Sequence, residues 1–189
     1  SLACHGRVAA DSDKVKMGLP EVKIGILPGA GGTQRLPRVV GLETALNMIV
    51  SGASVPAGKL ARTALFDVEV DGDVVDAAVA LLKEKIAAGG PHPRIRDRKV
   101  EHDDAEAFIA WARMGVAAAS KNFPAPLRCV DAVAASLKPF DAGMAVEREG
   151  FTVLLNSPES KALRHAFFGE RAAGKIDDNG AELVERRID

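Results

Sequence analysis

The sequence predicts an α/β fold in which short strands come first and helices follow. Between residues 7 and 70, short apolar segments alternate with turn residues, and from residue 73 onward apolar residues recur at helical spacing. The chain has 189 residues, of which 47% are hydrophobic and 27% are charged. That composition is ordinary for a globular protein, and the length suffices for one domain with a sizeable core.

The elements expected in the first part of the chain are all brief. The expected strands are residues 7–10, 14–17 and 66–70, and the expected helices are residues 33–40, 42–50 and a short one opened by residues 54–57. Proline is tolerated in the first turn of a helix, so Pro37 and Pro56 are expected in such positions.

One stretch, residues 18–37, combines a carboxylate with a glycine-rich turn. Glu21 precedes an apolar run of strand length over residues 22–27, which Pro28 and Gly29 close. Glycines at 29, 31 and 32 allow close backbone approach and leave N–H groups free to face a ligand. A carboxylate beside such a turn is a candidate general acid/base. Spacing alone favours a solvated turn glutamate over a functional one, and the stretch contains neither GxGxxG nor GxxxxGK[ST].

The second part of the chain is expected to be helical. The expected helices are residues 73–88, 103–120, 124–137 and 141–155, and a last one that begins at Ser157 and ends at Gly174. Residues 91–99, rich in proline and arginine, are expected to form a solvated connector; the alternative is that their charges contact an anionic ligand.

Side chains on these helices allow further expectations. Glu147 and Glu149 are expected on the polar face of their helix rather than as a catalytic pair. Five aromatic residues either fill one internal core or face partners: Phe108, Trp111, Phe151, Phe167 and Phe168.

Composition also argues against several classes of function. A formal net charge of −1 disfavours a nucleic-acid-binding protein, whose affinity depends on an excess of lysine and arginine. The apolar runs are too short to span a bilayer. Cys4 and Cys129 are expected to be free thiols in a reducing cytosol, and the four histidines show no metal-ligand spacing.

Several segments resemble one enzyme family. The run PEVKIGILPGAGGTQRLPR closely resembles the signature of the enoyl-CoA hydratase/isomerase (crotonase) family, and LACHGRVAADSDKVKMGLPE looks like the segment that leads into it. The pieces PHPRIRDR, NFPAP and SPESKALRHAFFGERAA are similar to the hydratase/isomerase part of multifunctional fatty-acid β-oxidation enzymes. In those enzymes a 3-hydroxyacyl-CoA dehydrogenase domain follows. The resemblance covers most of the chain and is most specific near the start.

For the fold, the resemblance implies the C-terminal half of a crotonase-like β-β-α spiral followed by a helical layer. The implied parts are a partial crotonase core over residues 1–90, a connector over 91–102, the helical part of the domain over 103–175, and a charged tail over 176–189 leading to a further domain. The family's first catalytic glutamate and the two oxyanion-hole N–H groups belong to a segment that would precede Ser1. The chain is therefore expected to be N-terminally truncated.

For the chemistry, the resemblance implies hydration or isomerisation of 2-enoyl-CoA thioesters in fatty-acid β-oxidation. Glu21 matches the family's second catalytic glutamate, and Gly29 matches the glycine whose backbone N–H helps to place the water. No metal or redox cofactor is implied, because CoA is part of the substrate. The implied protein is a cytoplasmic homo-oligomer, and the chain alone is expected to be inactive.

Two alternatives stay open. One is a different crotonase-type acyl-CoA enzyme, such as an isomerase, decarboxylase or hydrolase, since a glutamate at this position serves several chemistries. The other is a non-catalytic interaction domain built from the helices of residues 91–155.

Overall fold

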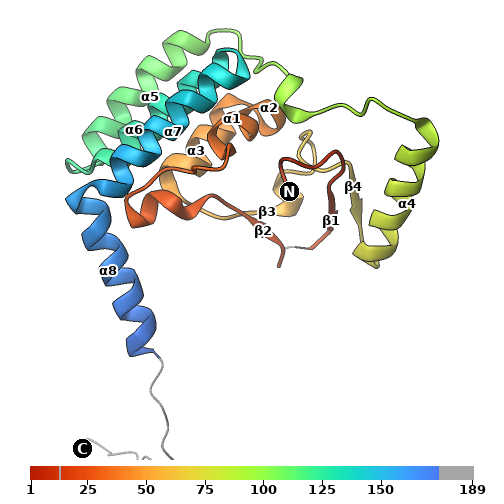
Figure 1. Ribbon diagram of the computed structural model, residues 1–189, viewed down its shortest axis with the longest axis horizontal. Helices are drawn as coiled ribbons and strands as arrows, with labels where there is room; N and C mark the ends of the chain where they lie inside the picture. Colours follow the sequence, from red (N-terminus) through yellow and green to blue (C-terminus); the bar gives the residue numbers. More distant parts are fainter. Residues whose placement is uncertain (13, 175–189) are drawn as a thin grey trace, which may run out of the picture.

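The structure, a computed structural model, describes residues 1–12 and 14–174. Short strands and one helix lie at one end of the molecule, and a layer of longer helices lies at the other (Figure 1). Short strands come first and a helical layer follows, so the predicted α/β arrangement is confirmed. None of the helices in the described part is long and apolar enough to cross a membrane.

Two small sheets carry the strands. β1 (Val8–Ala10) and β4 (Val68–Val70) pair in parallel, with Val8 opposite Val68. β2 (Lys16–Met17) and β3 (Val55–Pro56) pair antiparallel, with Met17 opposite Val55. Parallel strands need a long crossover. Here the crossover from β1 to β4 contains the whole glycine-rich stretch and the helices that follow it.

Three consecutive helices follow the glycine-rich turn. They are α1 (Gly32–Arg35), α2 (Pro37–Val40) and α3 (Leu42–Ser51). Pro37 begins α2, where its missing N–H costs no intrahelical bond. Gly41 separates α2 from α3 with a φ of 84°, a backbone conformation that favours glycine. Both predicted helical segments are confirmed, with an additional break at Leu36.

The prediction of a strand directly after Glu21, over residues 22–27, is wrong. Residues 20–24 form a short 3-10 helix, η1 (Pro20–Ile24), which begins at a proline and ends at Gly25 with a φ of 75°. Ile26 and Leu27 are buried behind it. A short apolar run cannot be told from a buried helical turn by its pattern alone, and here the flanking proline and glycine favour the turn.

The expectation for residues 54–57 is wrong in part. Pro56 ends the short strand β3 instead of entering a helix, and the helical turn η2 (Ala57–Lys59) begins one residue later. Met17 lies opposite Val55, so pairing with β2 decides the local structure.

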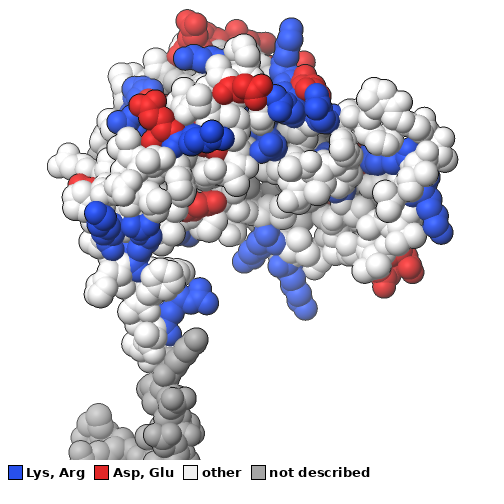
Figure 2. All heavy atoms as spheres, viewed as in Figure 1, with Lys and Arg blue, Asp and Glu red and all other residues white. Residues whose placement is uncertain are grey.

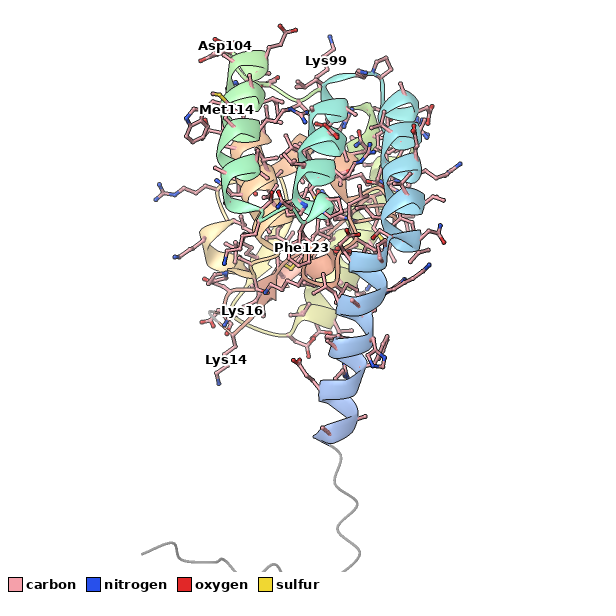
Figure 3. The ribbon with its side chains drawn as sticks, turned by 90° about the vertical axis from the view of Figure 1, so that its left-hand side faces the viewer. Lys14, Lys16, Lys99, Asp104, Met114 and Phe123 are labelled. Carbon is pink, nitrogen blue, oxygen red and sulfur yellow. The ribbon has the colours of Figure 1, made fainter. Side chains whose placement is uncertain are left out.

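The helical layer consists of α5 (Ala105–Ala119), α6 (Pro124–Ala134), η4 (Ala135–Leu137), α7 (Phe140–Asn156) and α8 (Pro158–Ala173). Figure 3 shows α5, α6 and α7 side by side, with α8 extending below them. Ser157 caps α8 by accepting the Ser160 N–H at 3.1 Å, as its sequence position predicts. The main core lies between this layer and α3, around Leu27, Ile49 and Leu154.

Helix α4 (Val74–Ala88) lies apart from that layer, beside β1 and β4 (Figure 1). Asp73 caps it, accepting the Val75 N–H at 2.7 Å. The predicted helix is confirmed, but much of its apolar side is exposed: Val75 is 69% exposed and Ile86 is 68% exposed.

The connector after α4 is partly packed. Ile95, in the short helix η3 (Ile95–Asp97), is buried in the core. Its charged neighbours form ion pairs: Arg94 Nε lies 2.7 Å from Asp97 Oδ2, and Arg96 Nη2 lies 2.8 Å from Asp141 Oδ2 on α7.

The five aromatic residues do not fill one core. Phe151 packs against the core, but Trp111 is 68% exposed and Phe168 is 65% exposed. Met114, beside Trp111 on α5, also lies on the outer side of that helix (Figure 3). Basic and acidic side chains are interspersed over the face shown in Figure 2.

Candidate active site

Glu21 lines a pocket of about 390 Å³. The pocket lies between the start of the chain, the segment before η1, and the turn that leads into α1. Most of its surface is apolar, with Met17, Leu36 and Met48 among the lining side chains, and Arg35 supplies a cation. An apolar pocket with few charged groups is the usual form of a small-molecule site.

The carboxylate of Glu21 is incompletely satisfied by the protein. Glu21 lies in the first turn of η1, and its residue is half-buried. One of its oxygens, Oε2, is buried and has no hydrogen-bond partner within the described residues. Buried polar atoms are nearly always paired, and the exceptions include groups kept for catalysis. Glu21 therefore combines a place on the pocket wall with a buried oxygen that no described protein group satisfies.

Cys129 on α6 stands behind this carboxylate. Its side chain is completely buried, and burial together with the negative charge of Glu21 raises the pKa of the thiol to about 12. The thiol is therefore neutral across the physiological range and is not a nucleophile. Both Cys4 and Cys129 are free, as expected.

Gly29 lies in the same turn but not on the pocket surface. Pro28 and Ala30 line the pocket, whereas a Cβ on Gly29 would lie only 2.6 Å from Cδ2 of Phe151. The structure thus shows why residue 29 has no side chain, namely the approach of α7. The role of its backbone N–H in placing water stays a prediction.

The position expected for Glu147, on the polar face of its helix, is wrong. Glu147 is completely buried, not on a polar face, and binds the glycine-rich turn. The Gly31 N–H donates to Oε1 at 2.6 Å, the Thr33 N–H donates to Oε2 at 3.0 Å, and the Thr33 hydroxyl also donates to Oε2. Burial raises the pKa of the Glu147 carboxyl, and these hydrogen bonds oppose that shift.

A signal for this burial was present in the spacing of α7. The buried positions of that helix are Phe140, Gly143, Glu147, Gly150 and Leu154. These alternate by three and four residues, which is the pattern of a buried helical stripe. Glu147 lies in the middle of that stripe, between two glycines that permit close approach.

The network continues into α1 and α6. The Gln34 amide Nε2 donates to the Thr33 hydroxyl at 2.9 Å and to the Ala132 carbonyl at 2.7 Å. A Cβ on Gly143 would overlap Gln34 Oε1, so α7 can approach α1 this closely only with glycine there. Three helices thus converge on one end of the turn.

Comparison with known proteins agrees with this fold. Residues 1–107 match the family model described as enoyl-CoA hydratase/isomerase, and the chain belongs to that family. Among solved structures, carnitinyl-CoA hydratase from Mycobacterium avium is 26% identical with a TM-score of 0.51; the match covers 86% of this chain and 51% of that one.

Two further structures are similar. Carnitinyl-CoA dehydratase from Mycobacterium avium 104 is 25% identical with a TM-score of 0.51, over 86% of this chain and 52% of that one. A candidate enoyl-CoA hydratase from Streptomyces avermitilis has a TM-score of 0.54 and 21% identity, over 92% of this chain and 52% of that one, and shows the fold alone. The chain thus spans about half the length of these structures.

The structure groups the predicted residues unequally. Glu21 lines the pocket and Gly29 lies just outside its lining, while Glu147 on α7 binds Gly31 and Thr33 in the turn that follows Gly29. No cluster of three or more potential metal-ligating side chains occurs among the described residues.

Proposed function

We propose that this chain supplies Glu21 as the general acid/base of an enoyl-CoA hydratase/isomerase acting on 2-enoyl-CoA thioesters. One observation carries the proposal: Glu21 lines an apolar pocket beside the glycine-rich turn, and one of its oxygens has no partner in the described protein. A carboxylate in that setting has a free site at which a proton can be exchanged.

The chemistry assigns one proton to Glu21. In hydration the C2–C3 double bond opens, the water oxygen bonds to C3, and a proton is added to C2. The Glu21 carboxyl donates the proton to C2, and a second carboxylate takes the proton that the water loses. In isomerisation the same carboxyl returns to one carbon the proton that it removed from another.

The similar structures support reversible hydration. The names of the two Mycobacterium avium proteins describe a hydratase and a dehydratase of a carnitinyl-CoA thioester, and both are at least 25% identical to this chain. The mostly apolar lining of the pocket suits an acyl chain.

The active site is proposed to be shared with a segment that this chain does not contain. In hydratases of this family a thioester oxyanion is held by two backbone N–H groups, and the loss of one such donor typically costs roughly 100- to 1,000-fold in rate. The chain alone is therefore proposed to be inactive. The proposed context is a cytoplasmic, homo-oligomeric enzyme of fatty-acid β-oxidation, joined to a 3-hydroxyacyl-CoA dehydrogenase domain; the PHPRIRDR and SPESKALRHAFFGERAA segments support the last point.

The experiment is Glu21→Gln in the full-length protein that carries this chain. The amide keeps the shape of the side chain and cannot transfer the proton, so kcat for hydration of 2-butenoyl-CoA should fall by at least about 100-fold. Glu84→Gln on the exposed side of α4 is the matched control and should hydrate at the wild-type rate. Near-normal turnover by Glu21→Gln would remove Glu21 from the mechanism.

A further inference from the structure

The glycine-rich turn has two chemically different faces. On one face, Ala30 and Gly32 line the pocket that contains Glu21. On the other face, Gly31 and Thr33 donate hydrogen bonds to the carboxylate of Glu147 on α7. Residues of the turn alternate between the pocket and this carboxylate, so a movement of one face moves the other.

The turn has little local support: Arg35 Nη1 donates to the Ala30 carbonyl at 3.0 Å, but no side chain caps α1. Gly31 has a φ of 83° and precedes α1 without a side-chain cap. The first N–H groups of any helix have no partner inside it, and a helix as short as α1, four residues, is marginal without tertiary contacts. Glu147 supplies the missing acceptor from a residue 116 positions away.

The carboxylate is also tightly held. Glu147 has no exposed surface, and it accepts two backbone N–H bonds and one hydroxyl bond. The Thr33 hydroxyl, which donates to Glu147, in turn accepts a hydrogen bond from the Gln34 amide. A buried charge is a costly way to join two elements, because apolar packing would join them without desolvating an ion. The carboxylate fixes the orientation of the turn, because its two oxygens accept hydrogen bonds from two separate backbone N–H groups.

We propose that Glu147 is a positioning residue for the Glu21 site. Its carboxylate fixes residues 28–33 and thereby sets the distance between the pocket wall and Glu21. The inference rests on the proposed function, and it makes the helical layer part of the catalytic apparatus. A displacement of about 1 Å at a reacting centre can cost roughly 100-fold in rate, so an anchor of this kind matters for kcat.

The test compares Glu147→Gln with Glu149→Gln in the full-length protein that carries this chain. Both variants remove one negative charge from α7, but Glu149 is exposed. Glutamine at 147 keeps the size of the side chain, but its amide N–H₂ would face an N–H or hydroxyl group that is itself a donor. For 2-butenoyl-CoA, kcat of folded Glu147→Gln should fall roughly 10- to 100-fold, with KM within about threefold of wild type. Glu149→Gln should match wild type.

Two Thr33 variants keep the inference testable if Glu147→Gln does not fold. Thr33→Ser keeps the hydroxyl donor and should retain wild-type kcat. Thr33→Val removes the hydroxyl that donates to Glu147 and accepts from Gln34, while the Thr33 N–H still donates to Glu147, and it should lose part of kcat. A merely structural role for Glu147 would lower the fraction of folded protein and leave kcat per folded molecule unchanged.

Amide hydrogen exchange measures how firmly the turn is held, independently of enzyme activity. The amides of Gly31 and Thr33 should exchange faster in Glu147→Gln than in Glu149→Gln. Unchanged exchange at these amides, or wild-type kcat in Glu147→Gln beside an inactive Glu21→Gln, would overturn the inference. A wild-type protein that hydrates no enoyl-CoA would overturn the proposed function instead, and the exchange result would still decide whether Glu147 fixes the turn.

Discussion

At the scale of single residues, two carboxylates near one turn have opposite environments. Both oxygens of Glu147 accept hydrogen bonds, whereas Oε2 of Glu21 is buried without a partner in the described protein. A carboxylate whose oxygens are occupied is suited to holding structure, and one with an unpartnered oxygen is suited to exchanging a proton. We therefore propose two roles for the same chemical group, each set by its neighbours.

Burial of Glu147 predicts a pH dependence of stability. Because burial raises the pKa of this carboxyl, the folded protein binds its proton at a higher pH than the unfolded chain does. The stabilisation that comes from binding this proton is fully present below the ordinary glutamate pKa of about 4.3 and is lost as pH rises through the raised pKa of the folded state.

Urea unfolding across that pH range measures the effect. The free energy of unfolding of the wild type should fall with rising pH relative to that of Glu147→Gln, which has no carboxyl at 147 to titrate. Identical pH slopes in the two proteins would show that the burial of this group does not shift its protonation.

The candidate site was partly predictable at this scale. The resemblance of its motif to a family signature predicts Glu21 as a site residue, and in the structure Glu21 is one of the residues that line the pocket. Glu147 was missed because a charged residue in a helix is usually solvated. Only the buried stripe of α7, through Gly143, Gly150 and Leu154, indicates that Glu147 is buried. Its hydrogen-bond donors, Gly31 and Thr33, lie more than a hundred residues earlier in the chain.

At the scale of elements, the position of η1 depends on close packing against α8. A Cβ on Gly25 would lie 2.8 Å from the Cα of Ser160, and the Ser160 hydroxyl donates to the Ile24 carbonyl at 3.2 Å. This contact explains why the segment after Glu21 is a turn that ends at a glycine and not the predicted strand.

Gly25→Ala tests that packing. Gly25 has a φ of 75°, and the added methyl group would also meet backbone atoms of α8, so the free energy of unfolding should fall by at least about 1 kcal/mol. A Cβ on Gly72 would meet open space, so Gly72→Ala should stay within about 0.5 kcal/mol of wild type. Equal effects in chemical denaturation would refute the close contact.

Elements with strong local signals were predicted well. Asp73 and Ser157 mark helix starts, and Gly41 marks a break, because each acts through a local backbone rule. Strand pairing and burial are not local. The pairing of β3 with β2 converted an expected helix entry into a strand, and the apolar pattern of α4 did not reveal that much of its apolar side is exposed.

At the scale of the whole molecule, the helical layer reaches into the glycine-rich turn at several points. Phe151 closes on Gly29, Glu147 binds Gly31, and Gly143 makes room for Gln34. All three contacts come from α7, so the candidate site is built jointly by the segment around Glu21 and by a helix from the second half of the chain. Periodicity predicted that this helix exists, but not what it does.

The central claim is that Glu21 moves the proton at C2, and isotope exchange at that carbon tests it most directly. With the full-length protein that carries this chain in deuterium oxide, mass spectrometry follows replacement of the C2 proton of 3-hydroxybutanoyl-CoA. The wild type should exchange it, and Glu21→Gln should exchange it at least about 100-fold more slowly. Exchange by Glu21→Gln at a rate close to that of the wild type would contradict the account.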